Sequence, residues 1–147
     1  MQFITVFRTY SWDECIEKMA HKALKNSNGG DFVIAADFTN RVFDTPGFEC
    51  IGHTQSEIAN LGLPIIPKER PLWHNWDYIC PIILSWEKHK YDYYIVTESD
   101  VSVNMEFYRI CEKMMEDGID LIVDFIHTPT QEWMWYNDAL SVSNNPL

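Results

Sequence analysis

Continuous apolar runs recur along this chain, separated by segments with the polar signals of helix starts. The longer runs cover residues 2–7, 31–36, 91–97 and 120–126, and shorter ones cover 48–52 and 63–66. Runs of this kind, bounded by turn residues, are typical of strands buried on both faces of a sheet. They predict up to six strands.

Helix-start signals lie between the predicted strands. Ser11 with Glu14, and Thr54 with Glu57, have the form of capping boxes, in which a hydroxyl and a carboxylate three residues apart satisfy the first N–H groups. The first helix is predicted to run to about Asn26. Its apolar face is expected to consist of Cys15, Met19 and Ala23, and the stop to be residues 28–30.

Three further helices are expected on similar grounds. The helix that follows Thr54 is predicted to end at Leu61, with Gly62 as its terminal glycine. Asparagine can cap a helix start, so Asn75 predicts a helix to Lys88, and Asn104 predicts one through Met115 that closes at Gly118.

Strands that alternate with helices predict a three-layer α/β fold with a mainly parallel, Rossmann-like sheet. The chain has 147 residues, of which 46% are hydrophobic and 14% aromatic. This is enough for a packed core in a single domain spanning 1–147.

The charge of the chain narrows the choice of partners. A net charge of −11, with eleven scattered Lys and Arg residues, opposes binding to a phosphate backbone, so no nucleic-acid partner is expected. A phosphorylated small molecule would need a metal cation or helix N-termini to supply positive charge.

The cysteines and the apolar content indicate a soluble protein of a reducing compartment, and we expect the cytoplasm. Cys15, Cys50, Cys80 and Cys111 form no C-x-x-C motif, so they are expected to be apolar core residues. The sequence has no run of eighteen apolar residues, so no direct membrane span is expected. Association with a membrane through a partner stays open.

Two carboxylates, Glu98 and Asp100, follow the clearest predicted strand. Ligands of open α/β sheets bind at the carboxyl ends of parallel strands. In extended backbone, residues two apart point to one side, so both carboxylates can converge on one hard cation such as Mg²⁺ or Mn²⁺. The alternative is that both residues cap local turns, and the acid-x-acid string by itself favours neither.

The context of this motif suggests a family. The stretch HNWDYICPIILSWEKHKYDYYIVTESDVSVN (74–104) resembles the middle of nucleotide-diphospho-sugar transferases with the GT-A fold, and Glu98-Ser99-Asp100 matches their DxD-type signature in an ExD form. FVIAADFTN (32–40) resembles a second strand ending in an acid. DLIVDFIHTPTQEWMWY (120–136) resembles the strand and Trp-rich segment that follow the signature.

The resemblance implies transfer of a sugar from a UDP- or GDP-linked donor to an acceptor, with Mn²⁺ or Mg²⁺ bridging the two phosphates. It implies that Asp100 ligates the metal, and that Glu98 faces the ribose or the metal site. Thr9 and Asp37 would lie near the nucleoside, and Asp77 would contact the base or ribose.

Each assignment has a structural alternative. Thr9 and Asp37 can close turns after their strands, and Asp77 can be favoured by the dipole of a helix N-terminus. His127 is a candidate third metal ligand or a hydrogen-bonded structural residue. Trp133, Trp135 and Tyr136 can form a stacking platform on the acceptor side or belong to an interface.

The chain is shorter than the family pattern, which ordinarily continues into the acceptor pocket and its catalytic base. The catalytic residue is therefore unknown, and Asp124 and Asp138 are the remaining candidates for a base. The main rival is a shortened, non-catalytic domain that acts as a scaffold, as a homo-oligomer or with a partner chain. Phosphotransfer of the haloacid dehalogenase type is disfavoured, because its acid-x-acid motif would end the first strand.

Overall fold

The computed structural model describes residues 1–60, Ile83 and residues 91–120. The chain divides into two compact units, Met1–Asp117 and Gly118–Leu147. The fold described here is that of the first unit. The single domain expected over 1–147 stays a prediction.

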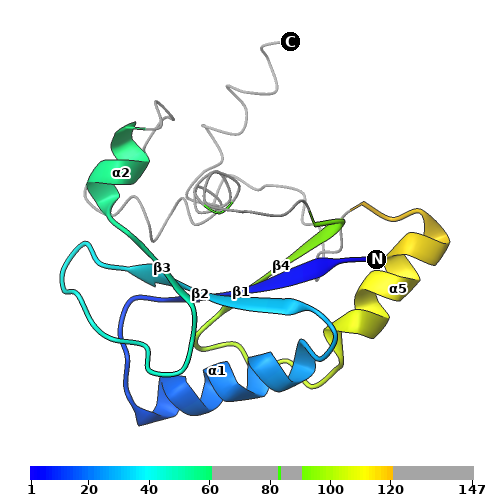
Figure 1. Ribbon diagram of the computed structural model, residues 1–147, viewed down its shortest axis with the longest axis horizontal. Helices are drawn as coiled ribbons and strands as arrows, with labels where there is room; N and C mark the ends of the chain where they lie inside the picture. Colours follow the sequence, from blue (N-terminus) through cyan, green and yellow to red (C-terminus); the bar gives the residue numbers. More distant parts are fainter. Residues whose placement is uncertain (61–82, 84–90, 121–147) are drawn as a thin grey trace, which may run out of the picture. The chain divides into compact units, whose positions relative to one another are not determined.

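A parallel sheet forms the centre of this unit (Figure 1). Its strand order is β3-β2-β1-β4, and β1 lies between β2 and β4. Every strand pairing among the described residues is parallel, which confirms the predicted α/β class with a mainly parallel sheet. The strands are β1 (Phe3–Thr9), β2 (Asp31–Asp37), β3 (Cys50–His53) and β4 (Tyr93–Glu98).

The helices of the described part are α1 (Glu14–Asn26), α2 (Gln55–Asn60) and α5 (Phe107–Asp117). α1 and α5 pack on one face of the sheet, which we call the α1 face. There Phe7 and Ile34 meet α1 residues such as Ala20, while Phe3 meets Phe107 of α5. Burial of these aromatic and branched side chains is the main driving force for docking both helices.

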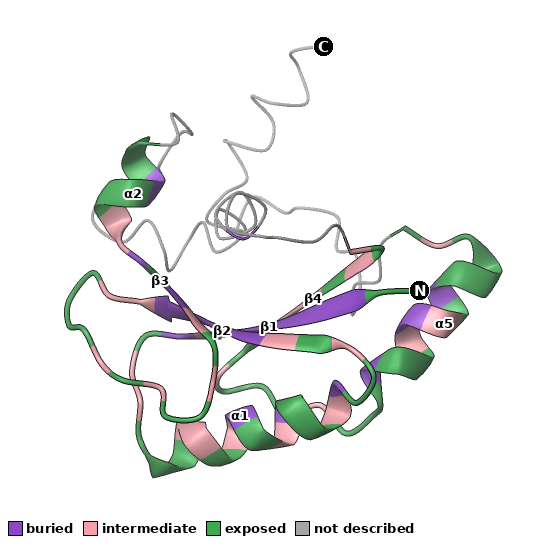
Figure 2. Ribbon diagram, in the orientation of Figure 1, coloured by how far each residue is buried: buried purple, intermediate pink, exposed green. Residues whose placement is uncertain are grey.

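The opposite face of the sheet also carries core. We call it the Ile83 face, because Ile83, a residue with helical backbone, packs there. Its other fully buried members are Ile4, Val6, Val33, Ala35 and Ile51. Figure 2 shows burial concentrated in β1 and β2, as expected for central strands covered on both faces.

The N-cap of helix α1 lies two residues after the predicted one. The N-cap is Asp13, whose Oδ1 accepts hydrogen bonds from the backbone N–H groups of Cys15 (2.8 Å) and Ile16 (2.9 Å). The predicted cap at Ser11 is wrong, because the Ser11 backbone is engaged with the hydroxyl of Thr9 instead. A carboxylate at the N-cap also interacts favourably with the helix dipole.

The buried face of α1 is shifted as well. Ala20 and Ala23 are buried and Ile16 and Met19 are half-buried, whereas Cys15 is exposed. The predicted face was therefore right at Met19 and Ala23 and wrong at Cys15. The expectation that cysteines are core residues is met at Cys111, which is buried; Cys50 is half-buried, and Cys80 lies outside the described residues.

The second capping box is confirmed. Glu57 Oε2 accepts from the Thr54 N–H at 2.7 Å, and the Thr54 hydroxyl accepts from the Glu57 N–H at 3.4 Å. The predicted cap at Asn104 is wrong, because α5 begins at Phe107 and the Asn104 side chain accepts a hydrogen bond from Lys22. The predicted stop of α5 at Gly118 is confirmed by its left-handed φ of 63°, which favours glycine.

The start of β2 at Asp31 is as predicted, and the other strand boundaries shift by one or two residues from the predictions. Several predictions lie outside the described residues: the strand at 63–66, residues 121–126 of the strand predicted over 120–126, the helix from Asn75 to Lys88 apart from Ile83, and the helix end at Leu61 and Gly62. Asp120, where a last strand was expected to begin, has no strand structure.

Candidate functional site

The four strands end at one edge of the sheet, which we call the carboxyl edge. Because all are parallel, their last residues, Thr9, Asp37, His53 and Glu98, lie along this edge. Every strand of the described sheet therefore presents a polar residue where α/β proteins bind ligands.

The topology singles out one position on this edge. From β1 the chain proceeds through α1 to β2 and β3 on one side, whereas β4 pairs with the other side of β1. The gap between the ends of β1 and β4 is thus the point where the strand order reverses. Crevices outside such switch points are the usual ligand sites of open α/β sheets, and the Glu98-Ser99-Asp100 motif lies directly beside this one.

The backbone turns immediately after Glu98. The N–H of Val101 donates to the Glu98 carbonyl oxygen at 3.1 Å, which closes a turn over residues 98–101. The extended backbone that would align Glu98 and Asp100 therefore ends at Glu98. Asp100 is exposed, and it makes no hydrogen bond or ion pair with another residue in the described part of the chain.

Glu98 is paired with a residue that the sequence did not single out. Arg8 and Glu98 are register partners on β1 and β4, and Arg8 Nη1 donates to Glu98 Oε1. The Arg8 side chain is 13% exposed and that of Glu98 is 48% exposed. The carboxylate at the switch point is thus neutralised by an arginine on the central strand.

Thr9 and Asp37 make local contacts. The Thr9 hydroxyl donates to the Ser11 carbonyl oxygen at 2.6 Å, and by strand alternation Thr9 belongs to the α1 face, as Phe7 does. Asp37 Oδ1 accepts from the Thr39 N–H at 2.8 Å. Both residues therefore stabilise the turns that follow their strands, and their predicted role at a nucleoside stays a prediction.

Asp37 also shares the Ile83 face with Arg8 and Glu98. It is the register partner of His53, and it lies two residues beyond Ala35, which pairs with Arg8. Strand alternation therefore directs Arg8, Asp37, His53 and Glu98 to the same face.

His53 is the second residue that sequence reasoning missed. Its side chain is only 3% exposed, and Nδ1 is buried with no hydrogen-bond partner among the residues that the structure describes. Burial lowers the pKa of the imidazole below its usual value and Arg8 lowers it further, whereas the Asp37 and Glu57 carboxylates act in the opposite direction. The lowered pKa favours the neutral imidazole, and His53 shares its sheet face with the charged residues Arg8, Asp37 and Glu98.

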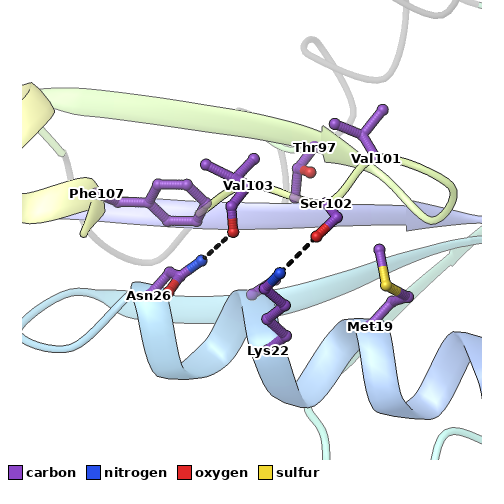
Figure 3. A pocket seen from close by; sticks show the side chains of 9 residues that line it. Met19, Lys22, Asn26, Thr97, Val101, Ser102, Val103 and Phe107 are labelled. Carbon is purple, nitrogen blue, oxygen red and sulfur yellow. Dashed lines mark hydrogen bonds between the residues drawn. The ribbon is translucent and has the colours of Figure 1, made fainter. Parts of the chain in front are cut away.

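Hydrogen bonds to α1 hold the segment that follows the motif (Figure 3). Lys22 Nζ donates to Ser102 Oγ at 2.6 Å, and Asn26 Nδ2 donates to the Val103 carbonyl oxygen at 2.8 Å. The cavity between α1 and this segment measures about 10 Å³, room for about one water molecule. It is a packing gap, too small for a ligand.

A divalent cation is compatible with the chemistry of the motif. Asp100 offers an exposed carboxylate, and hard cations commonly take one or two protein carboxylates and fill their remaining positions with water and phosphate oxygens. Within the described ranges no group of three or more His, Cys, Asp or Glu side chains is arranged to hold a metal ion. A cation bound at this motif would take carboxylate oxygens of Asp100 and Glu98, with water or a ligand in its remaining positions.

The other predicted site residues lie outside the described residues. They are the nucleoside candidate Asp77, the metal candidate His127, the base candidates Asp124 and Asp138, and the aromatic group Trp133, Trp135 and Tyr136.

The fold and this edge define a parallel α/β protein with acidic residues at its switch point. No protein-family model, curated protein or solved structure matches the chain. In the part of the chain that the structure describes, no helix has the length and apolar character needed to cross a membrane.

Proposed function

We propose that this protein binds a nucleotide-diphosphate sugar at the carboxyl edge, together with Mn²⁺ or Mg²⁺, and transfers the sugar to an acceptor. The observation that carries the proposal is the position of Glu98 and Asp100. They follow β4 at the switch point beside β1, where an α/β sheet of this order binds its ligands.

The carboxylate of Asp100, which has no hydrogen-bond or ion-pair partner within the described ranges, supports the choice of a cation. Asp100 is exposed at a turn whose backbone is fixed by the Val101-to-Glu98 hydrogen bond, so its position is defined without a side-chain partner. When bound, the cation would stabilise negative charge on the departing diphosphate. Asp100 would hold the cation, and Asp37, which ends β2, would accept hydrogen bonds from ribose hydroxyls, as acids at this position do in dinucleotide-binding sheets.

The GT-A fold belongs to this proposal. The order β3-β2-β1-β4, with an acid-x-acid motif after β4, is consistent with the expected resemblance. We further propose that the protein is cytoplasmic, and that a second copy or a partner chain covers its C-terminal edge.

Calorimetric titration of the full chain with UDP and with GDP, each with and without Mn²⁺, tests the proposal. We expect binding that requires Mn²⁺ and that weakens at least about tenfold in Asp100→Asn, because one charged metal ligand is lost. Glu116→Gln is the matched control, because it removes an exposed carboxylate from α5, which packs against the first residue of β1.

Failure of wild-type protein to bind either diphosphate with Mn²⁺ would refute the donor site and leave the scaffold role as the better account. Equal weakening in Asp100→Asn and Glu116→Gln would show a general charge effect and refute the assignment of Asp100.

A further inference from the structure

The carboxyl edge contains a cation of its own. Arg8 lies on the central strand, one residue before its end, and on the same sheet face as Glu98, Asp37 and His53. An arginine is charged at any physiological pH, and its fork of N–H donors matches the oxygens of a phosphate. It is held at the switch point itself, because its register partner is Glu98.

The switch point carries charges of both signs, from Arg8 on one side and from Glu98 and Asp100 on the other. A positive guanidinium lies on β1, and two carboxylates lie at and just beyond the end of β4. A metal–diphosphate unit is bipolar in the complementary sense, with a cation next to anionic oxygens. A bare anion would meet the neighbouring carboxylates, and a bare cation would meet the arginine.

We propose that Arg8 binds the phosphate oxygens of the donor and that Glu98 exchanges its partner as the donor arrives. In the structure Glu98 is bound to Arg8. When phosphate oxygens take the Arg8 donors, the Glu98 carboxylate becomes available to the cation held by Asp100. This inference rests on the proposed function, and it names the residue that recognises the diphosphate.

The exchange is feasible because the Glu98 side chain is half exposed, at 48%, and is therefore not confined by packing. The phosphate oxygens that replace Glu98 keep the Arg8 guanidinium paired, so the exchange leaves no buried charge without a partner. Arg8 is 13% exposed, so its guanidinium is fixed by its surroundings and preorganised for a ligand.

Two titrations on the full chain test the exchange, one with Mn²⁺ alone and one with Mn²⁺ plus UDP or GDP. In Arg8→Gln, we expect Mn²⁺ alone to bind at least about threefold more tightly, because Glu98 is released. We expect the nucleotide diphosphate with Mn²⁺ to bind at least about tenfold more weakly, because a charge-assisted contact to phosphate is lost. The two affinities should thus move in opposite directions.

Glu98→Gln provides a second variant at an exposed position. It removes the carboxylate that competes with phosphate for Arg8, so inorganic pyrophosphate without metal should bind more tightly than to wild type. Mn²⁺ alone should bind about as it does to wild type, in which Glu98 is held by Arg8. Arg109→Gln is the matched control, because Arg109 forms an exposed pair with Glu106 at the N-terminal end of α5, and it should change none of these affinities.

The outcomes separate this inference from the proposed function. Absence of any diphosphate binding to wild type overturns both. Metal-dependent binding that is lost in Asp100→Asn but unchanged in Arg8→Gln overturns the role of Arg8 and leaves the donor site standing. If Arg8→Gln loses folded structure by circular dichroism, its affinities for Mn²⁺ and for the diphosphate will both fall, and Glu98→Gln then decides. Unchanged pyrophosphate binding in Glu98→Gln overturns the exchange.

Discussion

The hydroxyl groups of Ser27 and Thr5 are hydrogen-bonded at 2.8 Å in the core, and this contact joins the end of α1 to the central strand. Ser27 is 1% exposed and Thr5 is 0% exposed, so neither hydroxyl reaches water. Ser27 Oγ also bonds the carbonyl oxygen of Ala23 at 2.8 Å. The C-terminal end of α1 is thereby fixed to the sheet by polar contacts as well as by apolar packing.

We therefore expect Ser27→Ala to lower the free energy of unfolding by about 1–3 kcal/mol, because the Thr5 hydroxyl stays buried without its partner. Thr5→Val should cost less, since Ser27 keeps the Ala23 carbonyl. Urea unfolding of both variants and of the double variant measures the coupling. Additive effects within about 0.3 kcal/mol would mean that the two hydroxyls do not interact in solution.

The cap of α1 provides a second test. Asp13→Ala should destabilise the protein by about 1 kcal/mol, because two backbone N–H groups lose their acceptor. Ser11→Ala should have an effect within about 0.5 kcal/mol, since its side chain caps nothing in the structure. Urea midpoints of the two variants decide the matter, and a larger effect at Ser11 would restore the predicted capping box.

The two capping motifs show what local sequence could decide. Thr54 and Glu57 form the predicted reciprocal bonds, whereas Ser11 and Glu14 have the same spacing and do not. The difference is that Asp13, a stronger acceptor, competes two residues away from Ser11. Strands were easier to predict, because an apolar run such as that of β2 is buried on both faces regardless of its exact neighbours.

The candidate site was predictable only in part, because half of it depends on register. Glu98 and Asp100 were found from their position after a strand. Arg8 lies 90 residues from Glu98 in the chain, and only the pairing of β1 with β4 brings them together. His53 gave no local signal either, since its burial depends on the strands and side chains around it.

Gly30 carries a steric prediction. A Cβ at this position would overlap the ring of Phe3, a residue that is 1% exposed and packs against Phe107 and Cys111. Gly30→Ala should therefore lower the free energy of unfolding by about 1–3 kcal/mol, as overpacking in a core does. The double variant Gly30→Ala with Phe3→Leu should be at least about 0.5 kcal/mol more stable than the sum of the two single effects predicts. Denaturant unfolding of the three variants measures this difference. If the two single effects simply add, the destabilisation by Gly30→Ala does not come from overlap with the Phe3 ring.

His53 makes the stability of the protein depend on pH. Burial lowers the pKa of the folded imidazole below the value of 6.5 that applies to an unperturbed histidine. Above about pH 6.5 the side chain is neutral in both states, and the stability associated with it is complete. As the pH falls below that value, the unfolded chain binds a proton that the folded chain does not, so stability is lost until the folded pKa is passed.

We therefore expect the free energy of unfolding to fall from pH 7.5 to pH 5.5 by up to about 1.4 kcal/mol per pH unit from this group. His53→Gln should remove that part of the slope, whereas His21→Gln, on the exposed side of α1, should retain it. Urea unfolding at several pH values within this range makes the comparison. If the slopes of wild type and His53→Gln coincide, the idea that burial lowers the pKa of His53 is wrong. The protonated imidazole would then be stabilised in the folded protein by a carboxylate such as Asp37, which acts to raise that pKa.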